Sequence, residues 1–200
     1  MLSSSTILGM GRWEPNARGR LELAALELYS ERGFEQTTVA EIAKRAGLTE
    51  RTFFRQFADK REVLFWGAGA LQELLVSSVA SAPDSTLPID AVSAALQVAG
   101  ALLQERRDYA RKRQAVIAAN PELQERELIK LASLGSAVAD VLRRRGVRDP
   151  AASLTAEAGI AVFKVAFDSW VNETEQRDLP QLIRESLDEL KAVTSGAERR

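Results

Sequence analysis

The chain has 200 residues, with 27 lysines and arginines against 28 aspartates and glutamates, and it contains neither cysteine nor histidine. The absence of cysteine excludes disulfides, thiolate nucleophiles and thiolate metal sites, and the absence of histidine excludes Ser-His-Asp catalysis and histidine-ligated zinc. We therefore expect a protein that is not an enzyme and that holds no metal ion or cofactor.

An all-α fold is predicted, because apolar residues recur at helical spacing along almost the whole chain. Prolines and glycines fall between these periodic segments, and Pro88, Pro121, Pro150 and Pro180 stand where helices are expected to begin. About nine helices are expected, at residues 17–33, 38–46, 49–56, 59–81, 88–106, 108–119, 121–145, 150–176 and 180–195.

Residues 37–57 carry the most specific pattern in the chain. Thr38 and Glu41 have the spacing of a capping box, which starts a short helix. Gly47 is placed to end this helix in a left-handed conformation, and Thr49 then caps a second short helix. The apolar residues expected on the inner sides of the two helices are Val39, Ile42, Ala43, Ala46, Phe53 and Phe57. Two short helices joined by a tight glycine turn indicate a helix-turn-helix, whose second helix enters the major groove of DNA.

Candidate DNA contacts follow from this geometry. The outward positions of the second helix are Glu50, Arg51, Thr52, Phe54, Arg55 and Gln56. Arginine suits guanine and glutamine suits adenine in the major groove. Further contacts, mainly with phosphates, are expected from Thr37, Thr38, Thr49 and Lys60. The same pattern is also an ordinary way to pack three helices, with the arginines simply solvated.

The basic residues before the first helix allow two interpretations. Arg12 or Arg18 could lie in an adjacent minor groove or along the DNA backbone. Alternatively, the segment is a disordered leader whose arginines are incidental. The spacing does not distinguish these possibilities.

The chain also resembles the TetR family of bacterial transcriptional regulators between Arg18 and Trp66. The matching residues are Ala24–Leu28, Glu31–Phe34, Thr37–Ala43, Ala46–Thr49, Thr52–Phe57 and Asp59–Lys60. The resemblance implies nine helices per subunit, three for DNA and the rest for a ligand and a dimer. The family often has tyrosine in place of Phe54, and its hydroxyl commonly contacts a phosphate. Because Phe54 lacks that hydroxyl, we expect it to contact a thymine methyl group or a sugar. The family also often has an aromatic residue or histidine in place of Gln56.

Three regions are therefore expected: a flexible arm at residues 1–16, a DNA-binding domain at 17–66, and a helical effector-binding and dimerisation domain at 67–200. The residues that could line an effector pocket, or simply form core, are Trp66, Leu71, Leu75, Leu103, Tyr109, Phe163, Phe167 and Trp170. The residues that could form a four-helix dimer interface, or again intrachain core, are Leu154, Ala158, Val162, Val165, Ser169, Leu182, Ile183, Leu187 and Leu190.

A basic cluster lies in the second half of the chain and is open to several interpretations. It consists of Arg106, Arg107, Arg111, Lys112 and Arg113. It could bind an anionic effector, supplement the DNA contacts, or form a solvated face.

The leading hypothesis is a homodimeric, sequence-specific DNA-binding regulator, a repressor rather than an activator. A small, largely apolar effector would release it from a palindromic operator in double-stranded DNA. The alternative is a TetR-like helical ligand-sensing or scaffold protein with weak or non-specific DNA binding. No segment has the pattern of a secretory signal or a transmembrane helix, so we expect a cytoplasmic protein without a membrane partner.

Overall fold

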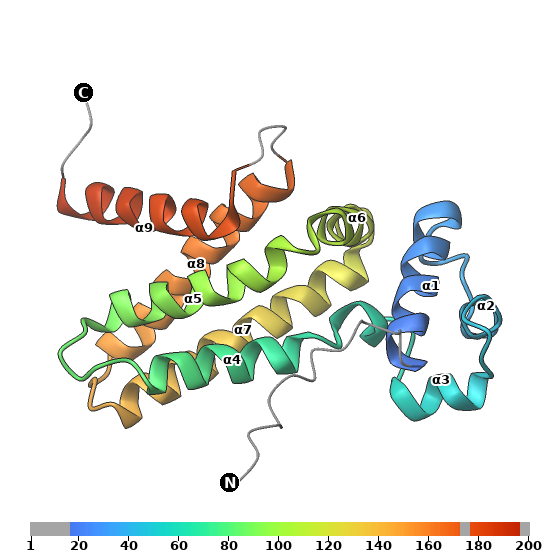
Figure 1. Cartoon of the computed structure of the whole chain (residues 1–200), viewed down its shortest axis with the longest axis horizontal. Coiled ribbons are helices and arrows are strands. Elements are labelled where there is room, and N and C mark those ends of the chain that lie inside the picture. The colour runs from blue at the N-terminus through green and yellow to red at the C-terminus, as the bar shows by residue number, and fades with distance from the viewer. Residues whose placement is uncertain (1–16, 173–176, 197–200) are drawn as a thin grey trace, which may run out of the picture. The chain divides into compact units, whose positions relative to one another are not determined.

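The structure is a computed structural model that describes residues 17–172 and 177–196. Within these residues every regular element is helical, which confirms the predicted all-α fold, and nine of the elements are α-helices. The chain divides into two compact units, Met1–Leu64 and Phe65–Arg200, which we call unit 1 and unit 2 (Figure 1). The expected arm at residues 1–16 lies outside the described residues.

Unit 1 contains three α-helices that pack on one another. The helices are α1 (Ala17–Arg32), α2 (Val39–Arg45) and α3 (Glu50–Gln56), and a 3₁₀ turn, η1 (Glu62–Phe65), follows them. The most deeply buried apolar residues of unit 1 are Leu21, Ala25, Leu28, Phe34, Ile42, Ala43, Phe53 and Val63. These residues come from all three helices and the segments that follow them, and they form the apolar core on which α2 and α3 rest.

Tyr29 carries a polar group into the core of unit 1. Its ring lies edge-on to Phe34, with 5.2 Å between the centroids, and its hydroxyl donates to the carbonyl of Lys60 at 2.7 Å. Burial, together with the negative charge of Asp59, raises the pKa of Tyr29 far above its usual value. The hydroxyl therefore stays protonated and links α1 to the segment after α3.

The predicted continuous helix at residues 59–81 is wrong, because the structure divides this segment. The carboxylate of Asp59 accepts hydrogen bonds from the backbone N–H groups of Arg61 at 2.8 Å and Glu62 at 3.1 Å, and the tight turn η1 follows. The α-helix α4 begins only at Ala68, directly after Gly67, and ends at Ala80. Glycine is a poor helix former, so Gly67 favours a break between η1 and α4. The apolar periodicity of the sequence continues across this break and does not indicate it.

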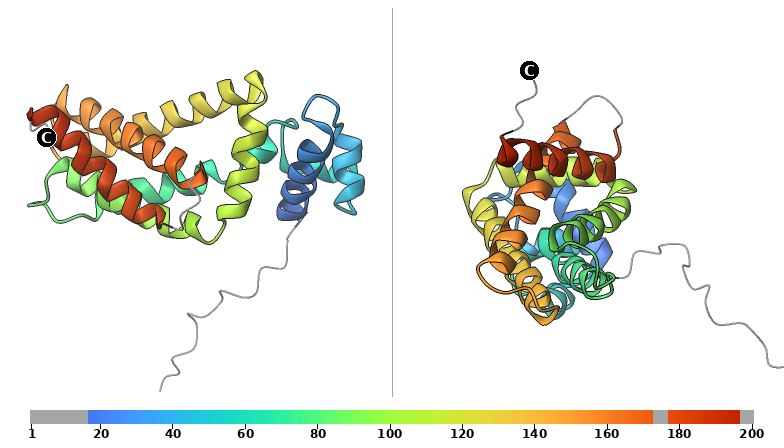
Figure 2. Two further views of the ribbon diagram at one scale, coloured as in Figure 1. Left: turned by 90° about the horizontal axis from the view of Figure 1, so that it is seen from above. Right: turned by 90° about the vertical axis from the view of Figure 1, so that its left-hand side faces the viewer.

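Unit 2 is built around two central helices. Its elements are α4 (Ala68–Ala80), α5 (Pro88–Gln104), α6 (Arg107–Ala118), α7 (Pro121–Arg144), α8 (Ala151–Asn172) and α9 (Leu179–Ser195). Helix α5 packs against α4, α8 and α9, and α8 packs against α5, α7 and α9, while α6 runs across the neighbouring helices (Figures 1 and 2). Gly159 permits the close approach of α5 and α8, because a Cβ there would lie 2.5 Å from Cγ1 of Val92.

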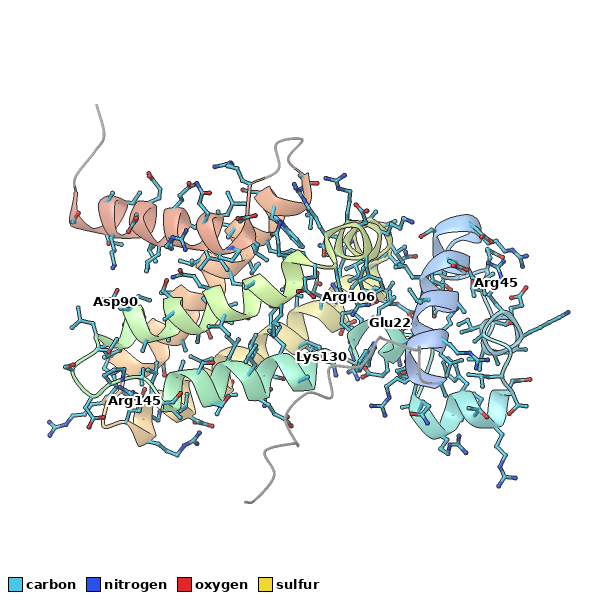
Figure 3. All side chains as sticks on the ribbon, in the orientation of Figure 1. Glu22, Arg45, Asp90, Arg106, Lys130 and Arg145 are labelled. Atoms are coloured by element: carbon cyan, nitrogen blue, oxygen red, sulfur yellow. The ribbon has the colours of Figure 1, made fainter. Side chains whose placement is uncertain are left out.

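Several arginines of unit 2 bind backbone carbonyls at helix ends. Arg107 donates to the carbonyl of Trp170 at 3.1 and 2.7 Å, and Arg111 donates to that of Val171 at 2.9 Å. Both carbonyls lie at the C-terminal end of α8, where a cation is favoured. Arg145, labelled in Figure 3, binds the connection between α4 and α5. Its acceptors are the carbonyls of Ala80, Ala82 and Pro83. Part of the predicted basic cluster therefore holds unit 2 together.

One stretch, Glu62–Ala80, is long and apolar enough to cross a membrane when only length and composition are considered, with a mean hydropathy of 1.4. Core helices of soluble proteins meet the same criterion, so this stretch is weak support for a membrane span. Two of its residues, Leu75 and Val79, are buried in the core of unit 2.

Candidate nucleic-acid interface

The predicted capping box at the start of α2 is confirmed. The hydroxyl oxygen of Thr38 accepts the backbone N–H of Glu41 at 3.3 Å, and the Glu41 carboxylate accepts the N–H and the hydroxyl of Thr38, each at 2.9 Å. The N–H of Thr38 is the main reason that the pKa of Glu41 lies below its usual range, and the Thr38 hydroxyl and Arg32 lower it further. A carboxylate already receives the donors of Thr38, so a phosphate approaching this helix start would meet a negative charge.

The turn between α2 and α3 depends on a glycine and on an arginine from α1. Gly47 has a φ of +63°, and the N–H of Leu48 donates to the carbonyl of Ala43 at 2.8 Å. Arg20 donates to the carbonyl of Ala46 from both Nε, at 3.0 Å, and Nη2, and to that of Gly47 at 3.1 Å. Sequence reasoning identified Gly47 but missed Arg20, because no local spacing connects Arg20 to a turn 26 residues away.

Helix α3 presents the predicted polar surface. Thr49 caps the helix by accepting the N–H of Thr52 at 3.2 Å, and Phe53 is fully buried. Glu50, Arg51, Phe54 and Arg55 are exposed, while Thr52 and Gln56 are half-buried. The inward and outward positions expected from helical spacing are therefore confirmed, and the structure places six predicted contact residues on one short helix.

Four other predicted DNA contacts have different surroundings. The prediction for Thr37 is wrong for its side chain, which is buried and donates its hydroxyl to the carbonyl of Gly33 at 2.8 Å. Arg18 is half-buried, with its guanidinium 5.9 Å from the centroid of the Phe57 ring. Arg12 lies outside the described residues.

Lys60 is the fourth of these residues, and its ammonium group has intramolecular acceptors. It donates to the carbonyl oxygens of Phe34 at 2.9 Å and of Glu35 and Thr37 at 3.3 Å. The same ammonium lies 4.3 Å from the centroid of the Phe34 ring. A lysine has three N–H donors, so a phosphate contact would require Lys60 to release one of these carbonyls. In the structure its direct effect is to hold the turn between α1 and α2.

Arg45, labelled in Figure 3, belongs to an ion-pair network between α1 and α2. It pairs with Glu27 and Glu31, each at 3.1 Å. The hydrogen bond from Arg45 lowers the pKa of Glu31, and the hydrogen bond to Glu31 raises that of Arg45. Both residues are exposed at the surface, yet the charge of Arg45 is compensated within unit 1. The cations of α3 are therefore the better candidates for DNA contacts.

Six of the eight predicted pocket residues lie in or against the core of unit 2. Phe163, Phe167 and Trp170 form a row on α8, with ring centroids 5.7 and 5.5 Å apart. Leu75, Phe163 and Trp170 are buried, whereas Leu71, Leu103 and Phe167 pack against the core and Trp66 and Tyr109 are half-buried. In the described part of the chain, no three acidic residues gather where they could hold a metal ion.

An open groove of about 690 Å³ runs between α8 and α9. Its lining residues are Ala161, Val162, Val165, Ser169, Arg177, Leu182, Glu185, Ser186, Asp188, Glu189, Leu190 and Val193. Five predicted dimer residues are among them, and Leu154 and Ala158 lie elsewhere on α8. Ile183 and Leu187 do not line the groove and are buried in the intrachain core, and Val162 and Leu182 are buried there as well. Ile183 packs closely against Gly100 of α5, since a Cβ at Gly100 would lie 3.0 Å from Cδ1 of Ile183.

Two capped short helices, a left-handed glycine turn and an outward polar face on the second helix together define a helix-turn-helix domain of the DNA-binding class. Residues 23–65 match the family model for bacterial regulatory proteins of the tetR family, and residues 86–195 match the model for the MftR C-terminal domain. The second match alone spans more than half of the chain. The chain belongs to the TetR family and is a transcriptional regulator of that family.

Relatives of known sequence agree with this assignment. The chain is 27% identical over 168 residues to the transcriptional regulator MftR of Mycobacterium tuberculosis, a match that covers 82% of this chain and 84% of MftR. It is also 38% identical over 80 residues to the transcriptional regulator TcmR of Streptomyces glaucescens. That match covers 40% of this chain and 35% of TcmR.

Solved structures show the same fold. FadR from Bacillus subtilis in complex with stearoyl-CoA is 20% identical, with a TM-score of 0.62 over 86% of this chain and 96% of FadR. SmeT in complex with triclosan is 21% identical, with a TM-score of 0.65 over 88% of this chain and 90% of SmeT. FadR from Thermus thermophilus in complex with lauroyl-CoA is 24% identical, with a TM-score of 0.53 over 92% of this chain and 96% of that FadR.

Proposed function

We propose that the protein is a cytoplasmic, homodimeric repressor that binds a palindromic DNA operator through α3 and is released by a small, largely apolar effector bound in unit 2. The observation that carries the proposal is the exposed surface of α3. There Arg51 and Arg55 face away from the buried Phe53, and Gln56 lies beside them. Arginine offers two N–H donors to guanine, and glutamine offers a donor and an acceptor to adenine, so both distinguish base edges in the major groove.

The proposed contacts with the DNA backbone carry no base preference, and their residues surround the exposed surface of α3. Thr49 and Thr52 lie at the start of α3, with their hydroxyl oxygens 3.1 Å apart. Arg12, Arg18, Thr38 and Lys60 remain proposed contacts with phosphates or an adjacent minor groove. For Lys60 we expect its bonds to the turn between α1 and α2 to contribute by positioning unit 1. Substitution of Lys60 by alanine should therefore weaken binding to all DNA sequences alike.

Selection from random duplexes tests the DNA-binding part of the proposal. The protein should enrich a palindromic site, and its affinity should fall steeply as the salt concentration rises. Arg55→Ala should relax the base preference at one position of each half-site. Arg45→Ala is the matched control, because Arg45 is held by Glu27 and Glu31, and it should leave the base preference unchanged. If no sequence is enriched, the alternative of a ligand-sensing or scaffold protein is favoured.

The proposed dimer is formed by α8 and α9 of two subunits, which would assemble as a four-helix bundle. Exposed apolar side chains support this arrangement, since Val165 is 59% exposed and Val193 is 70% exposed, and both line the groove. An isologous interface of this kind relates two copies of α3 by a two-fold axis, which matches a palindromic operator.

The dimer is tested with Val165→Glu, which places a charge in the groove without changing a core residue. This variant should sediment as a monomer and bind the selected palindrome weakly. Leu128→Glu is the matched control, because Leu128 is 58% exposed on α7 but does not line the groove. It should remain dimeric. A Val165→Glu variant that stays dimeric would show that the interface lies elsewhere.

The proposed effector site lies near the aromatic row of Phe163, Phe167 and Trp170. The solved FadR and SmeT structures, which contain acyl-CoA or triclosan, support a ligand with a large apolar part. Lauroyl-CoA, stearoyl-CoA and triclosan are therefore the first probes, and a hit should release the selected duplex. In a Trp13→Phe variant, the remaining Trp66 and Trp170 should change their fluorescence on binding. An effector that releases DNA and changes neither tryptophan would contradict this placement.

A further inference from the structure

Phe54 is an exposed aromatic residue in unit 1, whose other described aromatic rings are buried. Its side chain is 56% exposed, whereas those of the other four aromatic residues in the described part of unit 1 are at most 5% exposed. These four are Tyr29, Phe34, Phe53 and Phe57. A single exposed apolar residue needs no explanation by itself, so the position of Phe54 on α3 carries the argument.

The position of Phe54 follows from the direction of Phe53. Successive residues of an α-helix are about 100° apart, so the inward direction of Phe53 places Arg51 and Arg55 on the opposite, outward side. Phe54 then lies on one flank of α3 together with Glu50, and Thr52 and Gln56 lie on the other flank. The Phe54 ring packs edge-on against Phe53, with 5.5 Å between the centroids. It is therefore held in place beside the two outward arginines.

The chemistry of a phenyl ring limits what it can contact in DNA. It has no donor for a phosphate oxygen and cannot form the paired hydrogen bonds by which arginine or glutamine recognises a purine. The thymine C5 methyl group is the apolar feature of a base edge in the major groove. Contact with this group would remove both apolar surfaces from water, which is favourable.

We propose that Phe54 recognises the C5 methyl group of one thymine in each half-site. Specificity at that position then comes from a methyl group and not from a hydrogen-bonding edge, while Arg51 and Arg55 recognise neighbouring base pairs. This inference rests on the proposed function, because it requires α3 to enter the major groove.

Deoxyuridine substitution tests the inference directly, since uracil has the hydrogen-bonding edge of thymine and lacks only the methyl group. Each thymine of the selected duplex is replaced in turn, in one half-site at a time. One replacement per half-site should weaken binding by the wild-type protein about fourfold, the equivalent of one buried methyl group. The same replacement should have no effect on the Phe54→Ala variant. Leu23→Ala, which removes an exposed apolar side chain from α1, should retain the wild-type response.

A second substitution adds the methyl group instead of removing it. Replacing the critical thymine–adenine pair by cytosine–guanine should weaken wild-type binding, and 5-methylcytosine at that position should recover part of the loss. The inference is overturned if a sequence is selected but no deoxyuridine weakens wild-type binding. It is also overturned if one deoxyuridine weakens the wild type and Phe54→Ala equally, because another residue then contacts the methyl group. If no sequence is selected at all, both this inference and the proposed function fail.

Discussion

Replacing Gly47 by alanine tests how the turn between α2 and α3 is held. The φ of +63° at Gly47 is a left-handed conformation that costs a residue with a Cβ about 1–2 kcal/mol. The new Cβ would also lie 3.0 Å from Nη2 of Arg20, which donates to the carbonyls of Ala46 and Gly47. Because Arg20 is exposed, we assign about 1 kcal/mol in total to the hydrogen bonds it would lose. Gly47→Ala should therefore destabilise unit 1 by about 2–3 kcal/mol.

Amide hydrogen exchange of Leu48 is the assay, because its N–H donates to the Ala43 carbonyl across this turn at 2.8 Å. In an Arg20→Ala background, the cost of Gly47→Ala should fall to the backbone part alone, about 1–2 kcal/mol. Gly33 is the control, since it has a φ of +90° and a Cβ there would meet no atom within 4 Å. Gly33→Ala should cost the same in both backgrounds. An equal cost for Gly47→Ala with and without Arg20 would refute the proposed role of Arg20.

Three further predictions concern pH, the core of unit 2 and the end of α8. A hydrogen bond from the backbone N–H of Thr38 lowers the pKa of Glu41 from its usual 4.5. The Glu41 carboxylate therefore stabilises the folded state above pH 4.5, and this stabilisation is lost as the pH falls through the lowered pKa. Glu41→Gln should be less stable than the wild type near neutral pH in urea unfolding, and this difference should shrink as the pH falls through the lowered pKa of Glu41. Ile183→Ala should lower the free energy of unfolding by about 2–5 kcal/mol without dissociating the proposed dimer. Leu128→Ala, at a residue that is 58% exposed and does not line the groove, should change it by less than about 0.5 kcal/mol. Unchanged stability in Ile183→Ala would place this residue outside the core. Arg107→Ala should cost about 1–2 kcal/mol and shift the fluorescence of Trp170 to longer wavelength, and an unshifted spectrum would show that Arg107 does not hold the end of α8.

The sequence predicted the features of α2 and α3 that depend on neighbouring residues. Thr38 and Thr49 have side-chain oxygens that cap a helix within three residues, and Gly47 has the conformational freedom to end one. Phe53 faces inward because helical periodicity places it opposite Arg51 and Arg55. These interactions act over less than two helical turns, so their residue spacing is visible in the chain.

Contacts between distant segments could not be predicted in this way. Arg20 and Lys60 bind carbonyls more than 20 residues away, and Arg107 binds one 63 residues away. A carbonyl belongs to every residue, so nothing in the sequence identifies which one will be bound. The sequence therefore showed Lys60 and Arg107 as candidates for binding DNA or a ligand, whereas the structure shows them holding a turn and a helix end.

Helix α9 illustrates a different limit. Its apolar residues have helical periodicity, but they lie on two different faces of the helix. Ile183 and Leu187 face the intrachain core, whereas Leu190 and Val193 line the groove beside α8. Periodicity identifies a buried side of a helix and does not say whether the covering surface belongs to the same chain. The break before α4 was missed for a related reason, because apolar periodicity continues through η1 and Gly67.

The central claim is that α3 of two subunits recognises a palindromic DNA sequence. It is tested most directly by measuring the affinity and stoichiometry of the wild-type protein on the selected palindrome and on a scrambled duplex of the same composition, both at about 150 mM salt. We predict two chains per palindrome and an affinity at least about a thousandfold higher than for the scrambled duplex. Equal affinities for the two duplexes would contradict the claim.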